Sequence, residues 1–323
     1  MGKFFLLPLI ILLTLTCFLM AVEQGTIIAA EKVRFATSVR DEPAQELPML
    51  AAEELSIWKK NALEVEWIPI RSGSDTNRAI AAGRIDLAIQ STITAIQGAA
   101  YGVPLVMVAE LGISNPFYIL VRPDSPIREP KELRGARIAI PRLGGASHAF
   151  GLVGAKALGI EKEVRFVSMG GPREMTAGLR AGAVEATMGT AIRQALFIFE
   201  GKERLILNVG DYLPKEWSDY VLVCRKEFAE GNPELVAGVI KAFFQATDFV
   251  MKNQKWTVEK LKSNYGHSGA SANEVYRMFK YSKEGRLERR AVENVTNFVM
   301  EYGIIAKEKA MPVDKLFTNT FIR

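Results

Sequence analysis

The stretch that decides the fold is SGSDTNRAIAAGRIDLAI, residues 72–89. Its first three residues are small, so a ligand can approach the backbone there. Ser74 or Asp75 can cap the helix that follows, and Gly83 can end it. Residues 85–89 then form a mostly apolar strand, as expected for a parallel sheet covered on both faces. The stretch therefore predicts an α/β unit with a polar loop at a helix start.

The same pattern occurs a second time, about a hundred residues later. Residues 179–185, LRAGAVE, align with residues 80–86, IAAGRID, and a second glycine loop at 170–173 opens the helix before them. Each copy has a loop, a helix, a glycine, an acidic residue and an apolar strand in the same order. The repeat predicts two similar α/β lobes.

Length and charge narrow the class of protein. A chain of 323 residues is long enough for two domains or one bilobal unit. It has 41 Lys and Arg against 36 Asp and Glu, a formal net charge of +5. The basic residues are scattered and form no stripe with interleaved aromatic residues, which argues against a nucleic-acid-binding protein. A mild positive balance suits a small anionic ligand.

The cysteines and histidines indicate neither a disulfide framework nor a metal site. Cys17 lies in an N-terminal apolar run, and Cys224 stands alone in an apolar strand, where we expect a buried, inert thiol. The two histidines, His148 and His267, are too few for a His-rich metal centre. We expect no metal and no cofactor.

The first 30 residues have the pattern of an export signal. A positive start precedes an apolar run over 4–22, and residues 28–30 place small side chains before a possible cleavage point. We predict a signal peptide over 1–30, a mature start at Glu31, and a location in the periplasm or at the extracytoplasmic membrane surface. An uncleaved anchor, or a lipoprotein attached at Cys17, is the alternative.

The remaining pattern predicts a chain that leaves one lobe and returns to it. Lobe 1 comprises residues 31–118 and 222–323, lobe 2 comprises 119–221, and the apolar runs at 117–121 and 219–224 are the crossings. From residue 232 onward the pattern is helical, and we expect these helices to pad lobe 1. The predicted fold class is α/β, with two mixed, mostly parallel sheets flanked by helices. Two crossings make a hinge, and a hinge makes a cleft that can close.

Four groups of motifs in this order resemble a known family. They are residues 72–75 with 81–86, residues 131–140 (KELRGARIAI), residues 145–148, and residues 222–228 with 232–234. The sequence resembles the nitrate/sulfonate/taurine-binding family of ABC-transporter receptors, which also contains thiamine-pyrimidine-binding relatives. The resemblance implies a type II periplasmic-binding fold, binding without chemistry, a monomer, and delivery of the solute to a membrane permease with its ATPase.

Candidate ligand-binding residues lie at the carboxyl ends of the predicted strands, where open α/β sheets bind ligands and where helix N-termini favour anions. The hydroxyl groups among them are equally explained by helix capping, Met188 by core packing, and His148 by packing or capping. Arg142 can pair with a carboxylate, sulfonate or phosphonate through two hydrogen bonds, or it is a solvated loop residue. The candidates are Ser38, Arg40, Ser72, Gly73, Ser74, Ser91, Thr92, Arg142, Gly145, Ser147, His148, Met188, Gly189 and Thr190.

These patterns favour a receptor over an enzyme. We find no nucleophile elbow, no phosphate-binding lysine loop and no zinc-binding helix motif. We expect an extracytoplasmic receptor of an ABC importer that captures a small organic anion, such as a sulfonate or a carboxylate, in the cleft between the lobes. The alternatives are an enzyme of the thiamine-pyrimidine-synthase type on the same scaffold and a ligand-sensing partner of a signalling protein.

Overall fold

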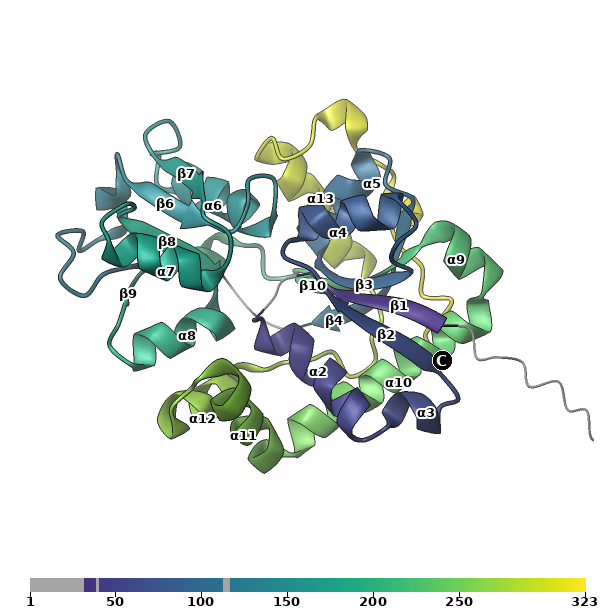
Figure 1. The fold of residues 1–323 in the computed structure, drawn as a ribbon. Coiled ribbons are helices and arrows are strands. Elements are labelled where there is room, and N and C mark those ends of the chain that lie inside the picture. Colours follow the sequence, from purple (N-terminus) through teal and green to yellow (C-terminus); the bar gives the residue numbers. More distant parts are fainter. Residues whose placement is uncertain (1–31, 39–40, 113–116) are drawn as a thin grey trace, which may run out of the picture. The chain divides into compact units, whose positions relative to one another are not determined.

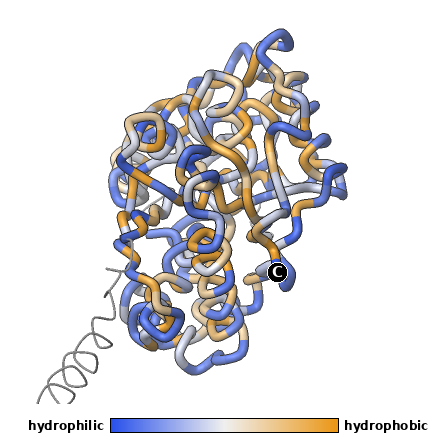
Figure 2. The backbone as a smooth tube through the Cα atoms, turned by 90° about the vertical axis from the view of Figure 1, so that its right-hand side faces the viewer, coloured by the Kyte–Doolittle hydropathy of each residue, from blue (hydrophilic) through white to orange (hydrophobic). Residues whose placement is uncertain are grey.

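The computed structural model describes residues 32–38, 41–112 and 117–323, which build two five-stranded sheets with helices around them (Figure 1). The predicted signal peptide, its cleavage point, Cys17 and Arg40 lie outside the described residues. Hydrophobic stretches alternate with hydrophilic turns along the chain (Figure 2). No helix within the described ranges is both long and apolar enough to cross a bilayer.

The first sheet has the strand order β2-β1-β3-β10-β4. β1 pairs in parallel with β2 and β3, whereas β10 runs antiparallel to β3 and β4. The strands are β1 (Lys32–Thr37), β2 (Glu64–Pro69), β3 (Leu87–Ser91), β4 (Leu105–Gly112) and β10 (Tyr220–Arg225).

The second sheet repeats this order as β7-β6-β8-β5-β9, with β5 as its antiparallel strand. Its strands are β5 (Phe117–Val121), β6 (Arg137–Ile140), β7 (Arg165–Ser168), β8 (Ala186–Thr190) and β9 (Arg204–Asn208). The repeated pattern in the sequence thus corresponds to a repeated sheet. The predicted fold class, two mixed and mostly parallel sheets with flanking helices, is confirmed.

The repeated acidic residue has a structural role in both sheets. Asp86 accepts hydrogen bonds from the backbone N–H, Nε and a terminal nitrogen of Arg34, at 3.0, 2.8 and 2.6 Å. Glu185 accepts the same three bonds from Arg137, at 2.7, 3.1 and 2.6 Å. Each pair joins a parallel strand, β1 or β6, to the loop before its parallel neighbour, β3 or β8, so the acid fixes the position of the two strands.

The glycines of the repeat end their helices as predicted. Gly83 and Gly182 have φ angles of +66° and +71°, in the left-handed region that favours glycine. β3 begins at Leu87, two residues later than predicted, although the backbone N–H of Asp86 already donates to the carbonyl of Arg34 at 3.0 Å.

The helices near the first sheet differ from prediction in one respect. The apolar spacing over 46–60 predicts a single helix, but α2 (Pro43–Glu54) and α3 (Ile57–Lys60) are separate. The break falls at Ser56, whose φ of +55° is left-handed and cannot continue a right-handed helix. Helices α4 (Gly73–Ala81) and α5 (Thr92–Ala100) follow β2 and β3.

The C-terminal helices contact elements of both sheets. α10 (Pro233–Lys252) packs on α2 and α3, and α13 (Arg289–Glu301) packs on α5, as expected for helices that pad lobe 1. α12 (Gly269–Met278) instead packs against α8 (Ala191–Phe199), the helix after β8 (Figure 1). The expectation that the helical return pads lobe 1 alone is therefore too simple.

The other helices are α6 (Ala146–Ala157), α7 (Pro172–Arg180), α9 (Lys226–Gly231) and α11 (Gln254–Tyr265), with 3-10 turns η1 (Pro130–Leu133), η2 (Val209–Tyr212), η3 (Lys307–Lys309) and η4 (Val313–Lys315).

The chain passes between the sheets twice. β5 already belongs to the second sheet at Phe117, and β10 already belongs to the first sheet at Tyr220. The strands within the predicted crossings, β5 and β10, therefore belong to one sheet each. The division into lobes 31–118 with 222–323 and 119–221 stays a prediction.

Candidate functional site

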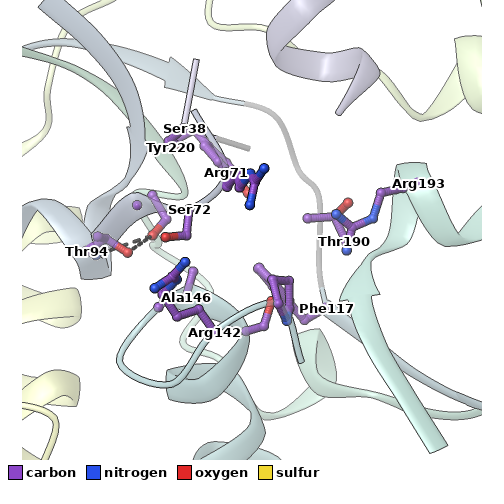
Figure 3. Close-up of a pocket in the computed structure, with 15 residues that line it drawn as sticks. Ser38, Arg71, Ser72, Thr94, Phe117, Arg142, Ala146, Thr190, Arg193 and Tyr220 are labelled. Carbon is purple, nitrogen blue, oxygen red and sulfur yellow. Dashed lines mark hydrogen bonds between the residues drawn. The ribbon is translucent and has the colours of Figure 1, made fainter. Parts of the chain in front are cut away.

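A pocket lies where strand ends and helix starts from both sheets meet (Figure 3). It encloses about 480 Å³ of empty space, part of which is open to solvent. Its lining residues are Ser38, Arg71, Ser72, Gly73, Ser91, Thr94, Phe117, Pro141, Arg142, Gly145, Ala146, Ser147, Thr190, Arg193 and Tyr220.

Eight of the residues proposed from the sequence line this pocket. They come from five separate loops, which the two sheets bring to one place because each loop follows the carboxyl end of a strand. Arg142 and Ser147 of the second sheet face the same space as Ser72 and Ser91 of the first. The eight are Ser38, Ser72, Gly73, Ser91, Arg142, Gly145, Ser147 and Thr190.

Three polar candidates lie near the pocket but do not line it. Thr92 is fully buried, and its hydroxyl is 2.9 Å from that of Ser218. His148 accepts a hydrogen bond from the backbone N–H of Gly144 at 3.3 Å. Ser74 lies 3.1 Å from the Ser72 hydroxyl, behind the pocket-lining residue. Their predicted contact with a ligand is not supported by this arrangement.

Two further candidates sit deeper in the second sheet. Met188 is fully buried in the hydrophobic core, so the packing interpretation fits it. Gly189 lies beside Arg193: a Cβ atom at Gly189 would stand 2.5 Å from a terminal nitrogen of that arginine. Gly189 therefore makes room for a lining residue. Arg40, the last candidate, lies outside the described residues.

Sequence reasoning missed seven of the lining residues. Arg71 directly precedes the Ser72 loop, Thr94 lies in the first turn of α5, and Arg193 lies in the first turn of α8. Their position could have identified them, because residues in the first turn of a helix that follows a strand-end loop point toward the site. Phe117, Pro141, Ala146 and Tyr220 carry no such signal, because their approach depends on how the sheets meet.

The helix starts at the pocket are partly capped by the candidate hydroxyl groups. Ser72 Oγ accepts from the backbone N–H of Asp75 at 3.2 Å, and Ser91 Oγ accepts from that of Thr94 at 3.3 Å. Ser72 and Ser91 thus cap helices and line the pocket at once. α6 starts differently: its N-cap is Gly145, which has no side chain to offer, so the prediction of Ser147 as N-cap is wrong. The start of α6 keeps N–H groups that face an incoming acceptor.

The charges at the pocket are mainly positive. Arg142 Nε lies 3.3 Å from Asp75, a carboxylate that also pairs with Arg78. Among the residues that the structure describes, the guanidinium groups of Arg71 and Arg193 form no hydrogen bond or ion pair. Arg193 is only 8% exposed. An anion in the pocket would meet up to three guanidinium groups.

Groups suited to catalysis or to metal binding do not gather here. None of the described lining residues is His, Cys, Asp or Glu. In ranges 32–38, 41–112 and 117–323, no three such side chains are close enough to hold a metal ion. Cys224 is a free, fully buried thiol in β10, and burial raises its pKa well above the ordinary value.

Comparison with known proteins defines the family. A family model described as NMT1/THI5 like matches residues 44–256, well over half of the chain, and the chain belongs to that family. The family resemblance inferred from the motifs is thereby confirmed.

Two relatives and one solved structure are similar to this chain. The taurine-binding periplasmic protein of Escherichia coli K12 is 26% identical over 224 residues, which cover 67% of this chain and 66% of that protein. A Saccharomyces cerevisiae protein named 4-amino-5-hydroxymethyl-2-methylpyrimidine phosphate synthase THI13 is 22% identical, with 85% of this chain and 88% of that protein covered. The alkanesulfonate-binding protein SsuA of Xanthomonas axonopodis pv. citri, solved bound to MOPS, has a TM-score of 0.77, 18% identity, and coverage of 89% and 98%. This last likeness concerns the fold, which is that of the periplasmic binding proteins.

Proposed function

We propose that this protein is the solute-binding receptor of an ABC importer and that it captures a small organic anion, such as a sulfonate or a carboxylate, without converting it. The observation that carries the proposal is the pocket, where Arg71, Arg142 and Arg193 meet helix starts from both sheets. Guanidinium groups and helix N-termini both favour oxyanions. Two relatives fit this class, since one is named taurine-binding and the other holds the sulfonate MOPS.

The same proposal covers location and partners. The signal pattern over 1–30 and the periplasmic relative support an exported protein that works outside the cytoplasm, and we expect it to be a monomer. A membrane permease and its ATPase would then receive the solute. The absence of His, Cys, Asp and Glu from the described lining residues supports binding rather than catalysis.

A thermal-shift screen tests the proposal. Purified protein would be melted with short alkanesulfonates, aromatic carboxylates, nitrate and pyrimidines. A true ligand at about a thousand times its Kd adds about 4 kcal/mol to the free energy of unfolding, which raises Tm by several degrees in a chain of this size. If no compound raises Tm, and turnover of any of them is detected, the receptor proposal is wrong and the synthase-type relative becomes the better guide.

A further inference from the structure

Arg193 is a buried cation that no described residue contacts through a direct hydrogen bond or ion pair. It lies in the first turn of α8, is 8% exposed, and forms no hydrogen bond or ion pair among the described residues. Its guanidinium is turned into the pocket (Figure 3). A buried charge is costly to a fold unless it is paired. A buried guanidinium that faces a cavity and has no direct partner among the described residues is therefore explained by a ligand that enters the cavity.

The backbone beside Arg193 is adapted to this position. Gly189 stands where a Cβ atom would come within 2.5 Å of the guanidinium and 3.0 Å of the Gln194 amide. Its φ is not in the left-handed region, so the turn does not itself require glycine. The missing side chain serves to accommodate Arg193.

The pocket offers an oxyanion two positions, one on each side. Arg142 and Ala146, the first residue of α6, stand on one side, and Arg193 stands on the other (Figure 3). Arg142 contacts Asp75 through Nε, and its terminal nitrogens form no bond among the described residues. The Phe117 ring lies on the pocket wall between the two arginines (Figure 3).

No described acidic group forms an ion pair with Arg193. Glu203 interacts with it electrostatically, but its carboxylate oxygens accept hydrogen bonds from Thr187 and Thr176. Glu42 lies behind Thr190, whose hydroxyl donates to a Glu42 carboxylate oxygen. Glu42 is fully buried and is not among the residues that line the pocket. Arg193 therefore keeps its positive charge available to a ligand.

From these observations we infer that the ligand carries two acidic groups joined by a short apolar spacer. One group binds Arg142 and the start of α6, the other binds Arg193, and the spacer lies against Phe117. This inference rests on the proposed function and specifies its ligand class.

Matched pairs of probes test the inference by isothermal titration calorimetry. Glutarate is compared with butyrate, 3-sulfopropionate with propane-1-sulfonate, and terephthalate with benzoate. In at least one pair the doubly acidic compound should bind at least tenfold more tightly, which is about 1.4 kcal/mol. In Arg193→Met this advantage should disappear, so that the doubly acidic compound binds no more tightly than the singly acidic one.

The ligand-free variants give a second readout. Because Arg193→Met removes an unpaired buried charge, its ligand-free Tm should rise above that of the wild type. A residue that merely supports the fold would lower Tm instead. If Arg193→Met does not fold, Gly189→Ala replaces it in the test, because this variant keeps the charge of Arg193 but displaces it. In Gly189→Ala the doubly acidic compound should lose its tenfold higher affinity.

The outcomes separate this inference from the proposed function. If singly and doubly acidic probes bind equally tightly, the ligand class is wrong and the receptor stands. If Arg193→Met lowers the ligand-free Tm and keeps the selectivity, Arg193 has a structural role and the inference fails. If no probe of either kind binds, the proposed function fails with it.

Discussion

Replacing Asp86 by Asn should destabilise the protein much more than replacing its counterpart Glu185 by Gln. The two acids make the same three bonds to an arginine, but Asp86 is 2% exposed whereas Glu185 is 39% exposed. Asp86 also accepts a bond from Arg225 at 3.2 Å. The amide nitrogen of Asn would face these cations and cannot accept their protons. Asn has nearly the shape of Asp, so the change leaves no cavity.

The size of the effect follows from burial. Removing one partner of a buried ion pair costs about 3–5 kcal/mol, and we expect about 3 kcal/mol because Arg34 is one-third exposed and can be hydrated. Losing a more exposed pair costs about 0.2–1 kcal/mol. At about 2–4 °C per kcal/mol for a chain of this size, Asp86→Asn should lower Tm by about 6–12 °C and Glu185→Gln by about 4 °C or less.

Differential scanning calorimetry of the two variants and the wild type measures this contrast. Burial would raise the pKa of Asp86, but the hydrogen bonds from Arg34 and Arg225 lower it below the ordinary value of 3.8. The contribution of Asp86 is thus present above that value and lost as pH falls through the folded pKa. At pH 7 the full difference in Tm between Asp86→Asn and Glu185→Gln should be observed. Equal losses in the two variants, or a larger loss in Glu185→Gln, would refute the argument from burial.

Three other changes test the pocket and its surroundings. Arg142→Ala should weaken an anionic ligand at least tenfold in calorimetric titration without unfolding the protein, whereas Asp75→Asn, which removes only its partner, should not weaken it. Gly73→Ala should lower the free energy of unfolding, measured by chemical denaturation, by about 1–3 kcal/mol, because its Cβ would stand 2.6 Å from a Thr94 methyl. Gly145→Ala is the control: its Cβ would have its nearest contact at 3.4 Å, and the free energy of unfolding should stay nearly unchanged. Burial raises the pKa of Glu110 to about 7 from 4.5, so the free energy of unfolding should fall as pH rises between these values, and Glu110→Gln should flatten that part of the Tm profile.

Much of the fold was predictable because its signals are local. The strand at 137–140 and the helix at 233–252 have the predicted bounds, since apolar alternation and flanking proline or glycine mark them directly. The break at Ser56 was missed because serine gives little warning of a left-handed conformation. Asp86 was recognised as part of a repeat, yet its arginine partners lie in distant strands that no local pattern connects to it.

The site was predicted only as far as loop position determines it. Ser72, Ser91 and Thr190 end up at the pocket because they stand where strands give way to helices. Met188 comes two residues earlier in β8, about 7 Å along the strand, which places it inside the core. His148 follows Ser147, but neighbours on a helix face about 100° apart, and its ring packs edge-on to Phe166. Arg193 was overlooked since its burial arises only from tertiary packing.

The position of β10 has a consequence for how the molecule is made. This strand sits between β3 and β4, yet it follows them by more than a hundred residues in the chain. A ribosome therefore delivers every strand of the second sheet, a continuous run from β5 to β9, before the first sheet can be completed. We expect the second half to become protected from protease first during translation, and a fragment that ends after β4 to remain unfolded until a peptide carrying β10 is supplied.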